Sequence, residues 1–165
     1  MSMLVNLVLN ALKFIFPAYC ANAAPVLFGG GLPIDFGKQF CDGKPIFGKN
    51  KTFKGFFSGL ATGTLVGAAE SIFFEYPPYF GFLLSLGALI GDLAGAFLKR
   101  RMGIPPGGTL PIVDQIDFVL GALIFSIPLN ILHPELVVTV LVVTPPLHLL
   151  TNFTAYKMGL KNTPW

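Results

Sequence analysis

Residues 91–118 read GDLAGAFLKRRMGIPPGGTLPIVDQIDF. This stretch holds both arginines of the chain, three of its five aspartates and one lysine, although only 12% of all residues are charged. Long apolar segments precede and follow it. Charges are costly inside a bilayer and collect at its surfaces. The stretch therefore predicts two membrane helices joined by a charged loop.

The composition of the whole chain agrees with a membrane protein. Its 165 residues are 53% hydrophobic, and the mean hydropathy is +0.71, whereas soluble domains carry about 25% charged residues. A helical span needs ~20 mostly apolar residues. We predict an all-α, polytopic membrane protein that forms a single domain over residues 1–165, with about five transmembrane helices and two cytoplasmic loops. The predicted spans are 3–22, 56–74, 79–98, 118–133 and 135–156.

The distribution of lysine and arginine predicts the orientation in the membrane. Five lysines lie between the first two spans, Lys99 and both arginines follow the third, and Lys157 and Lys161 follow the fifth, so ten of the eleven basic residues fall on one side. Basic residues favour the cytoplasmic side. We therefore expect a multi-pass protein of the cell membrane with its N-terminus outside and a basic cytoplasmic face that suits phosphates and anionic lipids.

Small and polar residues recur at helical spacing in the predicted spans. Residues four apart share one helix face, so the repeated glycines predict close helix packing. Polar groups in hydrocarbon need partners, so the polar faces should point inward. Glu70 is one candidate for an ion pair with Lys13, and the sequence does not decide whether this pair forms. The glycines are Gly55, Gly59, Gly63 and Gly67 in one span and Gly87, Gly91 and Gly95 in the next; the polar positions include Asn6, Asn10 and Lys13, and Thr144, His148 and Asn152.

Three aspartates and two basic residues form the candidate site. Asp92, Lys99 and Arg100 share a helix face, and Asp114 and Asp117 begin the next span three residues apart. Taken alone, the second pair could be an ordinary helix start and the basic pair a membrane anchor. Together, the carboxylates have the composition of a Mg²⁺ site shared with substrate phosphates. The basic residues would bind the remaining phosphate charge.

The loop between the first two spans is rich in glycine and lysine. It contains a Gly43-x4-Gly48-Lys49-Asn50 sequence, which differs from a phosphate-binding P-loop because it ends in asparagine and does not follow a strand. Lysines here would still neutralise phosphate, and the loop leads into a helix N-terminus, which favours anions. The alternative is a flexible basic loop that contacts lipid headgroups.

These segments resemble a known enzyme family. GDLAGAFLKRR followed by VDQID is similar to the signature of CTP-dependent phosphatidate cytidylyltransferases. GGGLPIDFGK and DGKPIFGKNKTFKG resemble more closely the archaeal branch, the CDP-archaeol synthases. The resemblance covers roughly residues 30–155. Departures from the bacterial pattern include Ala96 in place of serine and Gln115 in place of arginine, and they bear on the lipid substrate more than on the chemistry.

The resemblance implies CMP transfer from CTP to 2,3-bis-O-geranylgeranyl-sn-glycerol 1-phosphate, with release of diphosphate, in phospholipid biosynthesis. It implies Mg²⁺ as cofactor and CTP, the ether-lipid phosphate and membrane lipids as partners; no nucleic acid is expected, and a homodimer stays open. The chains of the lipid would lie in a lateral gap lined by Phe and Leu. The expected catalytic residues are Asp92, Lys99, Arg100, Asp114 and Asp117, of which the three aspartates bind metal; the expected CTP-binding residues are Asn22, Lys44, Lys49, Thr52 and Lys54.

Two alternative functions make different demands on the sequence. A CDP-alcohol phosphotransferase needs acidic residues four apart on one helix and an Asp-Gly that leads to Ala-Arg. Here Asp114 and Asp117 are three apart, and Asp42-Gly43 is followed by Lys44. A transporter or channel subunit would spread charge along a path through the spans. This chain gathers its charge at one face instead, with Lys13 and Glu70 as the main exceptions.

Overall fold

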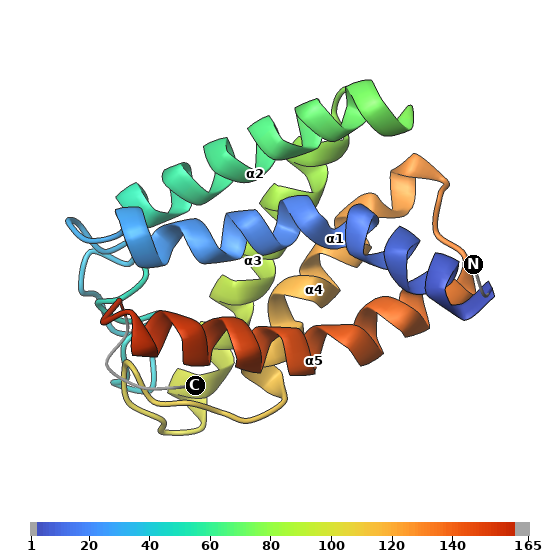
Figure 1. Cartoon of the computed structure of the whole chain (residues 1–165). Coiled ribbons are helices and arrows are strands. Elements are labelled where there is room, and N and C mark those ends of the chain that lie inside the picture. The colour runs from blue at the N-terminus through green and yellow to red at the C-terminus, as the bar shows by residue number, and fades with distance from the viewer. Residues whose placement is uncertain (1–2, 161–165) are drawn as a thin grey trace.

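The computed structural model describes residues 3–160 and is built of helices over that range. Two isolated β-bridges, Pro33–Thr52 and Gln39–Pro45, fold the first long loop back on itself. Figure 1 shows the helices as one bundle. The elements in chain order are α1 (Met3–Phe28), α2 (Phe53–Phe74), α3 (Phe80–Arg101), α4 (Val113–Ser126), the 3₁₀ helix η1 (Ile127–Leu129) and α5 (Pro134–Lys157).

Four of these helices, α1, α2, α3 and α5, are long and apolar enough to cross a membrane. The prediction of an all-α, polytopic membrane protein is therefore confirmed. The predicted span at 118–133 needs correction, because α4 begins earlier, at Val113, and ends at Ser126. Its 14 residues cover ~21 Å, less than the ~30 Å hydrocarbon core. The short η1 extends it until Asn130, in a left-handed conformation with φ of 55°, ends the run.

The first helix is longer than predicted. It passes residue 22 and ends at Phe28, with Pro17 and Pro25 inside it. Ala21 is fully buried, and a Cβ added to Gly59 of α2 would lie 2.5 Å from its carbonyl oxygen. This close backbone contact supports α1 where the prolines remove hydrogen bonds. The charged loop between α1 and α2 is correspondingly shorter.

Glycine faces bring the helices together, as their spacing predicts. The four glycines of α2 are buried and face α1 and α3: a Cβ at Gly63 would lie 2.6 Å from Pro17 O, and one at Gly67 would meet Gly81. On the other side of α3, a Cβ at Gly87 would lie 2.5 Å from Gly121 O of α4. Such contacts leave no space for side chains, so the α1–α2 and α3–α4 distances depend on glycine.

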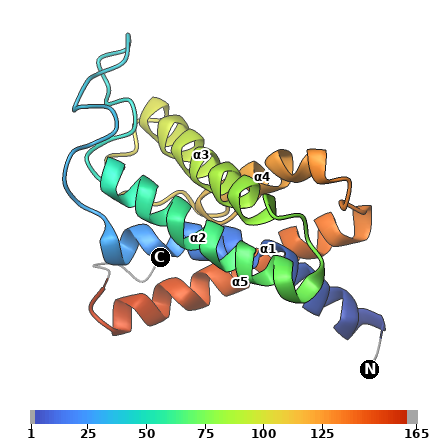
Figure 2. The ribbon, with the colours of Figure 1, turned by 90° about the horizontal axis from the view of Figure 1, so that it is seen from above.

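The two ends of the bundle differ. Loops 29–52 and 102–112 lie at one end together with the end of α5, and the beginning of α1 lies at the opposite end (Figure 1). We call these the loop end and the N-terminal end. The view in Figure 2 shows loop 29–52 projecting well beyond the helices. The segments that the sequence places on the basic side therefore meet at the loop end, as predicted.

Candidate active site

Two lysine–aspartate pairs lie at the loop end. Lys51, just before α2, places Nζ 2.6 Å from both carboxylate oxygens of Asp92 on α3. Lys99 on α3 places Nζ 2.7 Å from Oδ1 of Asp114 on α4. The approach of Lys99 is not directed as a hydrogen bond, and this buried Asp114 oxygen accepts none within residues 3–160. The pairs join three separate segments of the chain around one set of charges.

Asp117 lies between α3 and α4, against the glycine face of α3. A Cβ added to Gly95 would collide with the Asp117 carboxylate, and one added to Gly91 would collide with its backbone carbonyl. The glycines are therefore required for α4 to bring this carboxylate against α3. Asp117 is close enough to Asp92 and Asp114 for their negative charges to repel its own. The three aspartates chosen from the sequence thus lie in one region of the structure.

A strained turn sets the start of α4. Ile112 has φ of 70° and ψ of −54°, and Val113 N donates to Pro111 O at 2.9 Å, which is the geometry of a rare γ-turn. Such a conformation is unfavourable for a β-branched residue. Asp114 is not the N-cap, because Ile112 occupies that position; its Oδ2 instead accepts from Leu110 N at 2.9 Å. Asp114 therefore lies in the first turn of α4 but does not act as its N-cap.

Arg100 is the most unusual charged side chain of the site. It is only 4% exposed, and its Nε and Nη1 atoms have no hydrogen-bond partner among the described residues. The negative charge of Asp114 acts on it, and a Cβ at Gly48 of the long loop would lie 3.9 Å from Nη1. A buried guanidinium with free donors is costly unless an anion completes it. This arrangement suits a phosphate group.

Asp35 organises the loop that covers the site. Its carboxylate accepts backbone hydrogen bonds from Gly37, Phe47 and Gly48 at 3.0, 2.9 and 2.8 Å. Burial opposes the charged form, but these N–H donors outweigh it and hold the pKa of Asp35 below its usual value. Asp35 therefore fixes Gly48, and with it the part of the loop nearest Arg100.

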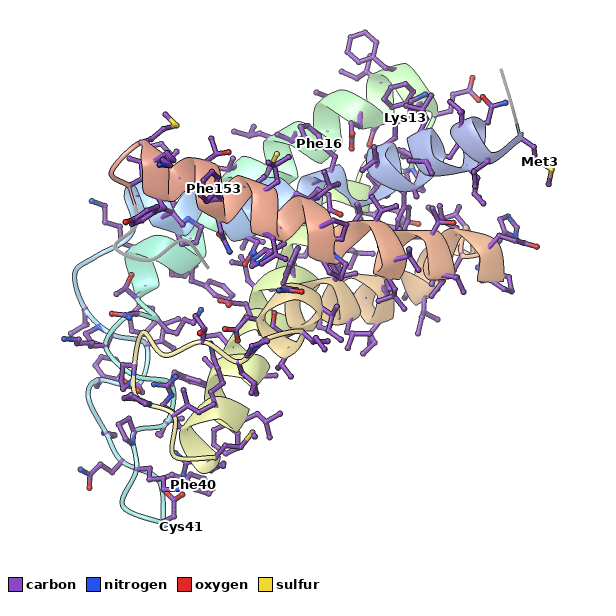
Figure 3. The ribbon with its side chains drawn as sticks, turned by 60° about the horizontal axis from the view of Figure 1, so that its bottom comes forward. Met3, Lys13, Phe16, Phe40, Cys41 and Phe153 are labelled. Atoms are coloured by element: carbon purple, nitrogen blue, oxygen red, sulfur yellow. The ribbon has the colours of Figure 1, made fainter. Side chains whose placement is uncertain are left out.

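Arg101, next to Arg100, has a different role. Its guanidinium lies over the rings of Phe40 and Phe97, 5.0 and 4.8 Å from their centroids. It also forms an ion pair with Asp42, and Lys44 Nζ donates to the Arg101 carbonyl at 2.8 Å. Figure 3 shows Phe40 at the far end of the loop. These contacts anchor the loop to the end of α3, so Lys44 is engaged in holding the loop.

The other residues predicted to bind CTP are placed differently. Thr52 is the N-cap of α2, and its hydroxyl accepts from Gly55 N at 3.1 Å. Lys49 and Lys54 are exposed at the loop end. Asn22 lies on α1 and lines a large cavity between α1 and α5. Nucleotide contacts of these residues stay predictions.

That cavity, which we call the lateral groove, has a volume of about 820 Å³. Apolar side chains of α1 and α5 line most of it, and Phe118, the neighbour of Asp117, lines it near the site. Tyr19 and Thr144 join α1 to α5 through a hydroxyl–hydroxyl contact of 2.8 Å. Lys13, Phe16 and Phe153 mark the helices around this side of the molecule in Figure 3. The predicted lateral gap therefore has a counterpart beside the aspartates.

The donor set fits a divalent cation in its chemistry. Carboxylate oxygens are the ligands that Mg²⁺ prefers, and the buried Asp114 Oδ1 accepts no hydrogen bond from the described part of the chain, although Lys99 Nζ lies beside it. Within residues 3–160, however, no three His, Cys, Asp or Glu side chains are arranged as a metal-binding group. Mg²⁺ commonly uses one or two carboxylates, with waters and phosphates as the other ligands. The residues present therefore suit a metal ion that binds together with a phosphate substrate.

Two important residues are missing from the sequence-based site. Lys51 was one of five lysines in the loop, and nothing in its spacing singled it out as the partner of Asp92. Asp35 lies in the Pro-x-Asp-x-Gly-Lys segment that carries the family resemblance, and this segment was the available signal. Lys51 acts through a contact with a distant segment, α3, whereas Asp35 acts within its own loop.

The fold and the site define a polytopic membrane protein with a charged, phosphate-compatible site that adjoins an apolar groove. A family model described as CarS-like CDP-archaeol synthase matches residues 4–165. The CDP-archaeol synthase of Pyrococcus furiosus is 48% identical over 164 residues, which cover 96% of this chain and 98% of that protein. That of Methanococcus aeolicus is 43% identical over 176 residues, covering 98% and 99%. This chain belongs to the CDP-archaeol synthase family.

A solved structure agrees with this assignment. It is described as an intramembrane enzyme for archaeal membrane lipids biosynthesis. It superimposes with a TM-score of 0.82 at 38% sequence identity, covering 88% of this chain and 94% of that one. The resemblance that the sequence motifs indicate is therefore confirmed over nearly the whole chain.

Proposed function

We propose that this chain transfers the CMP group of CTP to the phosphate of an unsaturated archaeal ether lipid, 2,3-bis-O-geranylgeranyl-sn-glycerol 1-phosphate, and releases diphosphate. Membership of the CDP-archaeol synthase family supports this reaction. It also favours cytidylyl transfer over a CDP-alcohol phosphotransferase and over a transporter.

The main structural support for this reaction is the buried side chain of Arg100. Its Nε and Nη1 atoms, which lack partners in the described range 3–160, lie in the region of Lys51, Lys99 and the three aspartates, so a phosphate bound here would accept hydrogen bonds from them. A transport pathway needs charge through the depth of the bundle, whereas these groups gather at the loop end. An anion with several phosphates, such as CTP, would supply the negative charge that Arg100 lacks, since Lys51 and Lys99 are already paired with Asp92 and Asp114.

The reaction then needs position and charge neutralisation rather than a general base. An oxygen of the lipid phosphate, already an anion, attacks the α-phosphorus of CTP, and diphosphate leaves opposite to it. Arg100 and Lys99 would hold phosphate oxygens, and Lys51 would keep Asp92 from repelling the substrate. Asp92, Asp114 and Asp117 would hold Mg²⁺, which when bound neutralises charge on the reacting phosphates.

The lateral groove and the loop end account for the two substrates. The groove reaches Phe118, next to Asp117, so a lipid phosphate could approach the aspartates while its chains remain among apolar side chains. The loop end would face the cytoplasm, because Lys and Arg favour that side and CTP would enter from there. The N-terminus would then face outward.

The direct test is turnover by the purified protein in detergent, with labelled CTP, the ether-lipid phosphate and Mg²⁺. We expect CDP-lipid formation that stops when EDTA removes the metal and resumes when Mg²⁺ is added. Arg100→Met, Asp114→Asn and Lys99→Ala should each lower kcat about 100- to 1000-fold, the usual effect of losing a group that stabilises developing charge. Glu75→Gln, at the opposite end of the bundle, is the matched control.

The results of these measurements distinguish cytidylyl transfer at this site from transport. Wild-type turnover in Asp114→Asn and Lys99→Ala, with folding intact, would contradict the assignment of the site. A second measurement needs no lipid: CTP with Mg²⁺ should raise the melting temperature of the wild type but not of Arg100→Met. A transporter would show little stabilisation by CTP and no product.

A further inference from the structure

Two cavities meet at the N-terminal end of the lateral groove. A second cavity of about 470 Å³ lies beyond it, near the turn after α2 and the turn before α5. Lys13 of α1 and Phe74 of α2 line both cavities. These two side chains therefore form the partition between the groove and the second cavity.

The partition has a defined structure. Lys13 Nζ lies over the Phe74 ring, 4.6 Å from its centroid, which is a favourable cation–π distance. Glu70 lies beside it in the lining of the groove, is only 9% exposed, and its Oε2 has no hydrogen-bond partner among the described residues. Lys13 and Glu70 form no ion pair within residues 3–160. The groove, which is lined mainly by apolar side chains, thus ends at an ammonium group and at a carboxyl group whose Oε2 lacks a hydrogen-bond partner within residues 3–160.

The position of the partition corresponds to the end of a lipid chain. The α1 residues that line the groove run from Leu12 to Leu27, which corresponds to ~22 Å along the helix. Phe118, next to Asp117, also lines the groove, and its ring centroid lies 5.9 Å from that of Tyr19. A lipid whose phosphate lies at the aspartates would extend its chains from the loop end toward Lys13 and Phe74. Tyr19 and Lys13 are six residues apart, ~9 Å along α1, so chains that start beside Phe118 reach the partition well within a ~30 Å hydrocarbon core.

We propose that Lys13 and Phe74, with Glu70, set the maximum length of the isoprenoid chain that this enzyme accepts. The inference rests on the proposed function, because it assumes that the groove holds the acceptor lipid. A chain that ends before the partition reaches neither the Lys13 ammonium nor the Glu70 carboxyl; the rest of the groove is lined mainly by apolar side chains, with uncharged polar ones such as Asn22 and Asn152. A longer chain must press hydrocarbon against the Lys13 ammonium and the Glu70 carboxyl, which removes their remaining solvation, or must displace the Phe74 ring.

Removing the partition should join the two cavities. Phe74→Ala deletes the aromatic wall, and Lys13→Met removes the charge while keeping a long side chain. Phe73→Ala is the matched control, because Phe73 is the neighbouring aromatic residue of α2, is 77% exposed, and lines neither cavity. None of these residues contacts the aspartate site.

The test compares three acceptors: glycerol 1-phosphate ethers whose two chains each have three, four or five isoprene units. We expect wild-type kcat/KM to fall from the four-unit to the five-unit acceptor. The five-unit to four-unit ratio should rise about tenfold in Phe74→Ala and Lys13→Met and stay unchanged in Phe73→Ala. Turnover of the three-unit acceptor in the same preparations shows that each variant is folded and active.

Several results would overturn the inference. One is a wild type that uses the five-unit acceptor as well as the four-unit one. Another is an unchanged ratio in both Phe74→Ala and Lys13→Met while the three-unit acceptor is still converted. Equal gains in Phe73→Ala would assign the effect to general loosening of α2. If the wild type converts no acceptor with CTP, the proposed function itself fails, and the inference fails with it.

Discussion

A single methyl group added at Gly95 should lower the catalytic rate strongly while lowering the stability of the protein only slightly. In Gly95→Ala the new Cβ would lie 2.8 Å from Asp117 Cγ, whereas ordinary contact begins at 3.4 Å. The carboxylate must therefore move by at least 0.6 Å, and by more to clear its nearer oxygen. A displacement of about 1 Å can lower a rate ~100-fold. Overpacking costs ~1–3 kcal/mol, of which the better helix propensity of alanine offsets about 1 kcal/mol.

The assay measures kcat and thermal unfolding of Gly95→Ala in the same detergent. We expect a loss of kcat of about 100-fold with a loss of stability of no more than ~2 kcal/mol. Gly87→Ala is the control on the same helix pair: its Cβ would lie 2.5 Å from Gly121 O and 2.7 Å from Phe125 Cβ, about two helical turns along α3 from Gly95. It should lose stability but keep its turnover per folded molecule. Near wild-type kcat in Gly95→Ala would refute the assignment of Asp117 to the reaction.

Three further predictions concern the loops around the site. Lys51→Met leaves Asp92 without its cation, so kcat should fall at least tenfold and KM for CTP should rise; unchanged kinetics would show that the pair has no part in catalysis. Asp35 has a lowered folded pKa, so its stabilisation of the loop is complete above the unfolded pKa of ~3.9 and is lost as the pH falls through the folded pKa. Limited proteolysis should therefore cut loop 29–52 of the wild type faster below about pH 4, whereas Asp35→Asn should be cut rapidly at every pH. Equal cleavage rates for both proteins at pH 7 would argue against this role of Asp35. Ile112→Gly relieves a φ of 70° and should raise the melting temperature, while the freer start of α4 lowers kcat; a lower melting temperature would mean that packing of Ile112 outweighs its backbone strain.

Much of the site follows from helical spacing. Asp92, Lys99 and Arg100 share a face of α3 because seven and eight residues are about two helical turns. The glycine faces of α2 and α3 were also predictable, because a four-residue interval on a membrane helix indicates close packing. Periodicity identifies such residues without any knowledge of what lies opposite them.

Helical spacing does not distinguish the adjacent residues Arg100 and Arg101. Both follow the same apolar segment, and either could bind phosphate or anchor the helix. The structure distinguishes them. Arg100 is buried, and its Nε and Nη1 have no partner among residues 3–160. Arg101 leaves only Nε without a partner there and is held by two aromatic rings and by Asp42. The path of loop 29–52, which depends on contacts such as those of Asp35, makes this difference. Because the position of Lys51 also depends on the path of this loop, its spacing in the sequence does not identify it as the partner of Asp92.

Composition and local spacing are enough to specify a helical membrane protein with its charges at one end, because the bilayer penalises each polar residue wherever it lies along a span. They do not specify which lysine meets which aspartate, where α4 begins, or that Lys13 and Phe74 close the groove. Those features arise when residues from different helices and loops come within a few ångströms of one another. Such distances depend on how the whole bundle packs, since close packing makes each contact conditional on its neighbours.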